Sequence, residues 1–564
     1  MTRATSRAGA VRRFPIVVGA LAVASPTVFC IARAELDDAA KQRWDANVLH
    51  GLAAIVVAFV LVALAGAVRG RRPDAVRRAL PGLASAIVLT AAVLWMVPPR
   101  MRVQFDESSL VGTSLSMHER RECTMVTSAV PFHGELVPVQ TLVDKRPPLF
   151  PFLVALVHDV AGPRPANAFV VNALALALAL FLAHRSVAER DGAIAGFAAQ
   201  LLLLAVPTTV VFATCAGFDF LATVLLGATL LAARAFLEVP DRRRFVMLVA
   251  TGLACSFTRY ESLFAVLLVA AVVVWRVRGR WSPGRIEALL LATLPTLVVP
   301  LVLLLLVSRE AHFRAEAGGQ PLFAGSHALG NAPALVRAWL QPSLFAATPG
   351  PVTFVALFAW IVWWWRRRRL PRDLALVIPV VGVTCLVVFW VGSDPENPGA
   401  LRLYLPLAFA TALSPLLLVG AFGTRVAPWL LGAAALVAAV RVDAVRRGVA
   451  FPQLDGERLT AVVAEELARP EFDAATTLWV TTIAQHVVTT GRAAIPPALF
   501  LRSREDVERW VAEGSVRAVF LLETPHDRGL AGGLGDPRDV LSVTSPRLVV
   551  HTGGAVPLSI HRLR

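Results

Sequence analysis

Residues 165–184 read PANAFVVNALALALALFLAH, twenty residues without an acidic side chain, a lysine or an arginine. A helix of this length rises about 30 Å, which is the thickness of the hydrocarbon layer of a membrane. Similar apolar runs recur along the whole chain. We therefore expect about thirteen membrane spans, near residues 14–33, 49–68, 80–98, 165–184, 192–207, 208–236, 245–258, 259–275, 286–307, 349–365, 372–391, 400–420 and 426–442.

The composition of the chain indicates the same class of protein. Of its 564 residues 56% are hydrophobic and only 17% are charged, and the mean hydropathy is +0.64. One water-soluble core cannot enclose that much apolar surface. Structural disulfides are not expected, because four of the five cysteines fall within apolar runs. The predicted fold is an all-α polytopic membrane protein.

The net charge of +16 comes largely from arginine clusters between the apolar runs. In a soluble protein such a charge suggests nucleic acid. Here the clusters occupy alternate connections, and cytoplasmic loops carry the excess of lysine and arginine. They predict a cytoplasmic N-terminus in the cytoplasmic (inner) membrane, with loops 99–164 and 308–348 outside, and no nucleic-acid partner. The first apolar run could instead be a cleaved signal peptide, which would leave the later orientations unchanged.

Two apolar stretches do not fit a simple span. Residues 245–275 have arginines at both ends and are interrupted by the sequence TRYE at 258–261. Equal charge at both ends requires an even number of crossings, so we expect two short helices that meet near the outer surface. Residues 149–162 are too short to span, and they follow two prolines at 147–148. We expect them to form an amphipathic helix on the outer interface.

The composition changes near residue 448, after which charged and apolar residues alternate. Strand-like sequences occur at 478–482, 516–523 and 547–552, and the sequence DVERWVAEG between the first two is helical in character. We predict a transmembrane domain over 1–447 and a small α/β domain over 448–564. With this orientation the smaller domain is extracytoplasmic. It has no phosphate-binding glycine signature.

Two adjacent acids, Asp106 and Glu107, lie just outside the third predicted span. A carboxylate at a membrane surface suits a general base. A hydroxyl that attacks a sugar must lose its proton, and a positioned base contributes roughly 10² to 10⁴ in rate. The alternative is a solvated loop acid that ends a helix.

Two cations, Lys145 and Arg146, precede the short helix at the depth of the lipid headgroups. Attraction to anionic lipids explains such residues in many membrane proteins. A departing lipid phosphate gains negative charge in the transition state, and fixed cations at this depth would lower the barrier. The sequence leaves both interpretations open.

Three charged residues lie within apolar stretches, namely Arg259, Glu261 and Asp219. Each such charge costs about 2.5 to 3.5 kcal/mol on insertion scales, so intramembrane charges usually pair or mark a pathway. A structural pair of Arg259 with Glu261 or with Asp219 is one alternative. For Asp219 alone we expect a structural, hydrogen-bonded role.

Both tyrosines of the chain lie beside intramembrane arginines. Tyr260 follows Arg259, and Tyr404 lies two residues after Arg402. This coincidence predicts one shared polar pocket. The histidines of the outer loops show no ligand spacing such as HxxxH, so the sequence indicates no metal and no other cofactor.

Four short motifs resemble those of the GT-C superfamily of polyprenyl-phosphate-sugar-dependent glycosyltransferases, which includes protein O-mannosyltransferases and the lipid A aminoarabinose transferase. FDES at 105–108 is similar to the acidic motif of the first loop, and KRPPLFPFLVALVHDVAG at 145–162 to the basic interfacial helix. SFTRYESLFAVL at 256–267 and RLYLPLAFA at 402–410 resemble two later basic motifs. The resemblance covers residues 80–420.

The resemblance implies a function and a set of site residues. Asp106 would be the catalytic carboxylate, and Glu107 would be a candidate to share that role. The residues expected to hold the donor phosphate are Lys145, Arg146, Arg259, Arg402 and Tyr404, supported by Tyr260, Glu261 and Asp219. The partners would be a polyprenyl-phosphate sugar donor, membrane lipids and an extracytoplasmic acceptor, which is a lipid, a glycan or a protein.

Two other functions compete with glycosyl transfer. A transporter or flippase of lipid-linked substrates needs the same cations and a membrane groove, but it does not need Asp106. Transporters often show paired repeats with matched broken helices, and the sequence has one clear break, at 258–261. A scaffold for cell-envelope assembly would explain the C-terminal segment but not the intramembrane arginines. The transferase interpretation requires Asp106 and the distant cations to converge at the outer rim of the bilayer.

Overall fold

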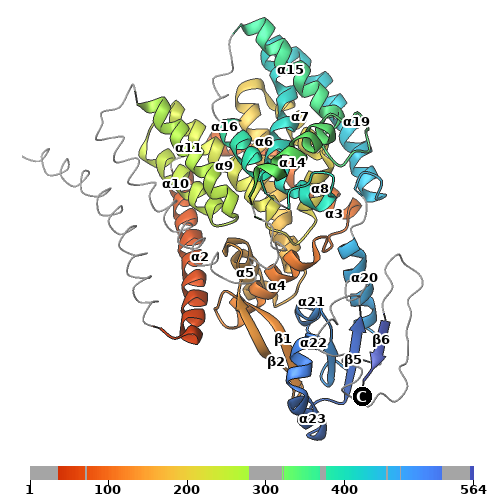
Figure 1. Cartoon of the computed structure of the whole chain (residues 1–564). Helices are drawn as coiled ribbons and strands as arrows, with labels where there is room; N and C mark the ends of the chain where they lie inside the picture. Colours follow the sequence, from red (N-terminus) through yellow and green to blue (C-terminus); the bar gives the residue numbers. More distant parts are fainter. Residues whose placement is uncertain are drawn as a thin grey trace, which may run out of the picture.

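A computed structural model describes residues 36–69, 73–278, 321, 323–368, 377–390, 392–451, 455–470, 472–523 and 559–563. In this part of the chain a helical bundle lies above a sheet (Figure 1). Seven helical stretches of the described residues are long and apolar enough to cross a membrane, so the chain is an integral membrane protein. They are Ala40–Val68, Val76–Met96, Asn167–Asp191, Asp219–Glu238, Tyr260–Val277, Pro398–Phe422 and Thr424–Arg446. The predicted spans 14–33 and 286–307 lie outside the described residues.

The bundle is built from long and broken helices. Its elements are α2 (Asp38–Val68), α3 (Pro73–Met96), α6 (Asn167–Asp191), α7 (Ala193–Leu204), α8 (Pro207–Ala213), α9 (Asp219–Glu238), α10 (Arg242–Ser256), α11 (Tyr260–Val277), α14 (Gly325–Trp339), α15 (Pro351–Arg367), α16 (Ile378–Val388), α17 (Leu405–Leu413), α18 (Leu417–Phe422) and α19 (Ala427–Arg446). Helices α6, α7, α19 and α3 pack together at its centre. Many of their buried residues are alanines, which allow helices to approach closely.

The predicted break near residue 258 is confirmed. Helix α10 ends at Ser256 and α11 begins at Tyr260. The prediction of one span over 208–236 is wrong. Helix α8 ends at Ala213, and a non-helical segment separates it from α9, which begins at Asp219. Just before this stretch, α7 and α8 meet at a bend of 76°. Pro207 lacks a backbone N–H and begins α8, while the amide of Asn172 donates to the carbonyls of Cys215 and Gly217 and so satisfies the irregular backbone.

A buried arginine fixes another irregular segment. Arg441 of α19 is 0% exposed and donates to the carbonyl oxygens of Leu344, Ala346, Thr348, Pro349 and Ala205. All five N–H groups of a guanidinium are thereby used. The loop between α14 and α15 is therefore wrapped around one side chain.

A six-stranded sheet lies at one end of the bundle, in the order β2-β1-β4-β3-β5-β6. Its strands are β1 (Thr124–Phe132), β2 (Glu135–Val143), β3 (Thr477–Val480), β4 (Ala493–Ile495), β5 (Ala518–Glu523) and β6 (Ser559–Arg562). Strand β3 runs parallel to β4 and β5, and β1 meets β4 antiparallel at Ala129 and Ala494. The sheet thus joins the first large loop to the C-terminal segment.

The hairpin β1–β2 is not predicted from the sequence. Its turn holds His133 and Gly134, both with positive φ, as two-residue hairpin turns require. Of the predicted strands, 478–482 and 516–523 correspond to β3 and β5, and 547–552 lies outside the described residues. The division at 447/448 stays a prediction, and the sheet crosses it.

Six shorter helices of the described residues complete the part around the sheet. They are α4 (Gln104–Glu119), α5 (Leu149–Ala161), α20 (Asp455–Leu467), α21 (Ala484–Thr489) and the consecutive pair α22 (Pro497–Arg502) and α23 (Arg504–Ala512). Helices α4 and α5 lie between the bundle and the sheet (Figure 1). Helix α5 occupies the stretch predicted to be a short helix after the two prolines.

Candidate active site

Helix α4 carries both predicted acids in its first turn and is buried along most of its length. It is nonetheless rich in hydroxyl side chains, and four of the five have a partner on another segment. The pairs are Ser108 with His486, Ser109 with Gln485, Thr113 with Asp144, and Ser114 with His158. Buried hydroxyls need such partners. The orientation of α4 is therefore set by hydrogen bonds as well as by apolar packing.

Asp106 lies between two arginines from distant parts of the chain. Its Oδ1 accepts from Nη2 of Arg146, and its Oδ2 accepts from Nη2 of Arg402. Burial raises the pKa of Asp106, but the charges of Arg402 and Arg146 outweigh it and hold the pKa well below its ordinary value. The side chain is still 27% exposed. Asp106 is thus an ionised carboxylate that a third group can reach.

Arg146 is oriented by the acid two residues before it. Oδ1 of Asp144 accepts from the backbone N–H of Arg146 at 3.0 Å and from its Nη1 at 3.2 Å. The other oxygen of Asp144 accepts from the hydroxyl of Thr113 on α4 at 2.9 Å. The turn before α5 is therefore fastened to α4, with the guanidinium of Arg146 directed at Asp106.

Arg402 and Arg259 share a second acid, Asp219, at the start of α9. Nη1 of Arg402 lies 3.8 Å from Oδ2 of Asp219, while Nη1 of Arg259 donates to Oδ1. Arg259 also donates to both oxygens of Glu261, at 3.2 and 3.0 Å. The chain contains both of the structural pairs that the sequence suggested for Arg259. Buried charges are retained in this form only when each is paired.

The ion pairs form one continuous chain of alternating charge. In order it runs Asp144, Arg146, Asp106, Arg402, Asp219, Arg259 and Glu261. Three arginines thus alternate with four carboxylates, and we call this set the charged chain. Its members lie in or just before the first turns of α4, α5, α9 and α11, where helix ends present N–H groups and a positive partial charge, and Arg402 lies in the short 3₁₀-helix Pro398–Tyr404 that precedes α17. Such a junction favours an anion.

Glu107 turns away from the charged chain. Its Oε1 accepts from the backbone N–H groups of Arg102 and Val103 at 3.1 and 2.9 Å, and its Oε2 accepts from that of Ala216 at 3.0 Å. The side chain is 0% exposed, and burial raises the pKa of Glu107 to about 7. These contacts are structural, and a catalytic share for Glu107 stays a prediction.

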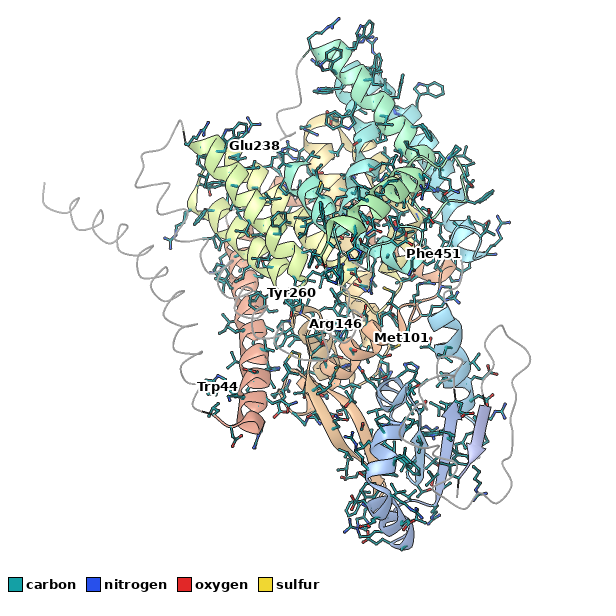
Figure 2. All side chains as sticks on the ribbon, viewed as in Figure 1. Trp44, Met101, Arg146, Glu238, Tyr260 and Phe451 are labelled. Atoms are coloured by element: carbon teal, nitrogen blue, oxygen red, sulfur yellow. The ribbon has the colours of Figure 1, made fainter. Side chains whose placement is uncertain are left out.

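The remaining predicted residues lie around the charged chain. The hydroxyl of Tyr260 donates to the carbonyl of Lys145, which ties α11 to the turn before α5. Figure 2 shows Tyr260 and Arg146 close to the boundary between the bundle and the lower part of the molecule. The hydroxyl of Tyr404 donates to the carbonyl of Ser393 at 2.7 Å, and its ring meets Trp339 edge to face. Tyr404 thus has a packing role in the contacts seen here.

Two cavities of very different size lie near this region, besides one of about 200 Å³ that shares Thr223, Leu226 and Pro406 with the smaller. The smaller, of about 20 Å³, is lined by members of the charged chain and by the first turns of α9 and α11. It has room for one or two water molecules. The larger, of about 590 Å³, is lined by apolar residues of α11 and α16, among them Phe264, Leu268 and Val381. An anion larger than water can enter only if the paired side chains move apart.

The hydrogen bonds of His158 show which of its ring nitrogens carries the proton. His158 receives a hydrogen bond at Nδ1 from the amide of Asn167, so its Nε2 carries the proton and donates to Ser114. Burial lowers the pKa of His158 to about 4. A proton-donating ring cannot activate Ser114 as a nucleophile. Within the residues that the structure describes, no group of three or more His, Cys, Asp or Glu side chains could hold a metal ion.

No protein-family model matches the sequence, and no curated protein matches it. Among solved structures, ArnT from Cupriavidus metallidurans bound to undecaprenyl phosphate is similar, with a TM-score of 0.54 and 15% identity. The similarity covers 86% of this chain and 98% of that one. The apo state of that protein gives a TM-score of 0.50 over the same shares, again at 15% identity. The chain therefore has the GT-C fold.

Within this GT-C fold the charged chain contains six predicted site residues, namely Asp106, Arg146, Asp219, Arg259, Glu261 and Arg402. The sequence did not identify Asp144 as a site residue, although its position two residues before Arg146 is typical of a side chain that caps a turn. Ser108 and His486 were also missed. No local pattern links two residues that are 378 positions apart.

Proposed function

We propose that this protein transfers a sugar from a polyprenyl-phosphate carrier to an extracytoplasmic lipid, glycan or protein. The observation that carries the proposal is the position of Asp106, a reachable carboxylate between two arginines at a junction of helix N-termini. The GT-C fold supports the same class of reaction, and its neighbour ArnT is known with undecaprenyl phosphate bound.

The arrangement fits a single displacement with inversion at the anomeric carbon. Asp106 takes the proton of the acceptor hydroxyl while the oxygen of that hydroxyl bonds to the anomeric carbon. The bond from this carbon to the phosphate oxygen breaks, and its electron pair remains on the phosphate. The carrier phosphate gains one negative charge, which Arg402, Arg259 and the cations before α5 stabilise.

Before the donor binds, the arginines of the charged chain form ion pairs with its carboxylates. The longest ion pair of the charged chain, at 3.8 Å, joins Arg402 and Asp219. This side of Arg402 is therefore the one held least closely by a carboxylate. It also borders the small cavity. We assign the donor phosphate to this side, where it replaces Asp219 as the partner of Arg402. The apolar cavity between α11 and α16 fits the isoprenoid tail.

The positions of the charges support an extracytoplasmic site. Glu238, at the α9 end that leads to the arginines at 242–244, lies at the far end of the bundle from Arg146 and Tyr260 (Figure 2). Because cytoplasmic connections carry the arginine excess, the charged chain and the sheet belong on the outer side. This orientation places the N-terminus in the cytoplasm and residues 448–564 outside.

The proposal is tested by reconstituting the protein in vesicles that contain undecaprenyl-phosphate-linked sugars labelled in the sugar. Two quantities are followed together, namely label transferred to added acceptors and label moved across the bilayer. We expect transfer, with release of undecaprenyl phosphate and inverted configuration at the anomeric carbon of the product. Movement of the intact donor without any transfer would instead show a flippase, and a product of retained configuration would exclude Asp106 as a simple base.

A further inference from the structure

The C-terminal segment contacts the helix that carries Asp106 directly. Helix α21 packs on α4, on β1 and on β4. Nδ1 of His486 lies 2.8 Å from the hydroxyl oxygen of Ser108, and the amide of Gln485 donates to the hydroxyl of Ser109 at 2.8 Å. The closest packing is at Gly112, where an added methyl group would lie 3.2 Å from Cγ2 of Thr489. We call these contacts the α4–α21 seam.

The seam contacts α4 at Ser108, two residues after Asp106. In a helix, two residues differ by about 200° in direction, so Ser108 points away from the side on which Asp106 meets its arginines. Asp106 is thus held by Arg146 and Arg402 on one side, while α21 fixes the opposite side of the same turn. A rotation of α4 by a few degrees would move the carboxylate relative to both guanidiniums.

His486 is a buried polar side chain whose hydrogen bonding is incomplete. It is 4% exposed, and its Nε2 has no hydrogen-bond partner among the residues that the structure describes. A buried polar atom without a partner is destabilising, and a phenylalanine or leucine would avoid that cost. The hydrogen bond to Ser108 is the one side-chain contact that distinguishes this histidine from an apolar residue.

We propose that His486 is a positioning residue for Asp106, acting through Ser108 to fix the rotation of α4, so that the C-terminal segment is a working part of the active site. The inference rests on the proposed function, since it assigns Asp106 as the base. It adds a purpose for residues 448–564, which carry none of the charged chain.

The first test is kinetic. His486→Ala and Ser108→Ala should each lower kcat by about tenfold and change the KM for the donor by less than about twofold, because the phosphate-binding arginines remain. The double variant should be no slower than the worse single variant. His486→Asn should restore most of kcat, because its amide occupies the place of Nδ1, whereas His486→Gln places it at Nε2 and should not.

The matched control is His184→Ala. His184 is also 4% exposed with one unpartnered ring nitrogen, but it packs in α6 against Gly82 and Gly196. It should reduce the folded fraction without lowering kcat per folded molecule. Equal losses of kcat in the two alanine variants, or multiplying effects of His486→Ala and Ser108→Ala, would overturn the proposal.

The second test does not depend on turnover. Hydrogen exchange of the amides at 104–112 should be faster in His486→Ala than in the wild type, restored in His486→Asn and unchanged in His184→Ala. Unchanged exchange in His486→Ala overturns the positioning role whatever the enzyme does. If exchange responds as expected but the wild type transfers no sugar, the proposed function fails while the seam stands.

Discussion

Arg402 is the residue at which the two halves of the charged chain meet, because it contacts both Asp106 and Asp219. A guanidinium is planar and offers five donors, so one arginine can serve two carboxylates and still face a phosphate. Lysine offers a single compact charge. At the scale of single residues, the site therefore depends on the shape of the cation as well as on its sign.

We expect Arg402→Lys to weaken binding of undecaprenyl phosphate by about tenfold or more. The charge remains, but one ammonium group cannot bond to Asp106 and to the phosphate on two sides as the planar guanidinium does. The measurement is a binding isotherm in detergent. Arg337→Lys is the control, since Arg337 is exposed and pairs with the exposed Glu396. Equal affinities in the two variants would show that Arg402 does not bind the phosphate.

Glu107 provides a structural prediction at the same scale. In Glu107→Gln one oxygen becomes an NH₂ group, which cannot accept from the backbone donors that now converge on the carboxylate. We expect a loss of stability of about 1–3 kcal/mol. It is measured as the shift in thermal unfolding of the detergent-solubilised protein. A variant as stable as the wild type would mean that these three contacts contribute little.

At the scale of elements, the sequence predicts most helices but not their local contacts. Long apolar runs such as 165–184 identify spans because the bilayer fixes their length. The break at 258–261 is predictable because a charged tetrapeptide interrupts an apolar run. Helix α4 and the β1–β2 hairpin were missed, because their stability comes from partners far along the chain, such as His486 and Ala494, rather than from local periodicity.

The α4–α21 seam should weaken in acid. Burial lowers the pKa of His486 to about 4, below the ordinary value of 6.5, so folding favours the neutral ring. This contribution is complete above pH 6.5 and is lost as the pH falls through about 4. Exchange of the amides at 104–112, corrected for its intrinsic pH dependence, should therefore rise between pH 6.5 and 4. In His486→Asn this rise should be smaller, and an identical rise in both proteins would contradict the assignment.

At the scale of the whole molecule, one sheet joins a loop near the start of the chain to its C-terminal segment. Ala129 of β1 packs with Trp479 on one face, and Val130 packs with Leu478 on the other. Composition correctly indicated strands after residue 448, but it could not show that their sheet continues into the first loop. Pairing between distant segments leaves no local signal in either of them.

This sharing predicts that residues 448–564 are incomplete alone. Without β1, the edge of β4 and the apolar residues around Trp479 and Leu478 become exposed to solvent. Fusing residues 122–145 to this segment should raise its stability by about 1 kcal/mol or more, which is roughly 4–8 °C in Tm. Equal midpoints for the two polypeptides would show that the C-terminal segment is an independent domain.

The central claim is that Asp106 removes the acceptor proton beside a phosphate held by arginines. The most direct measurement compares Asp106→Asn with Glu396→Gln, an exposed acid in a surface ion pair, for sugar transfer and for binding of undecaprenyl phosphate. The account predicts that Asp106→Asn loses roughly 10² to 10⁴ in transfer rate while binding the lipid phosphate at least as tightly, because Arg146 and Arg402 lose a competing carboxylate. Transfer by Asp106→Asn at the rate of Glu396→Gln would contradict it.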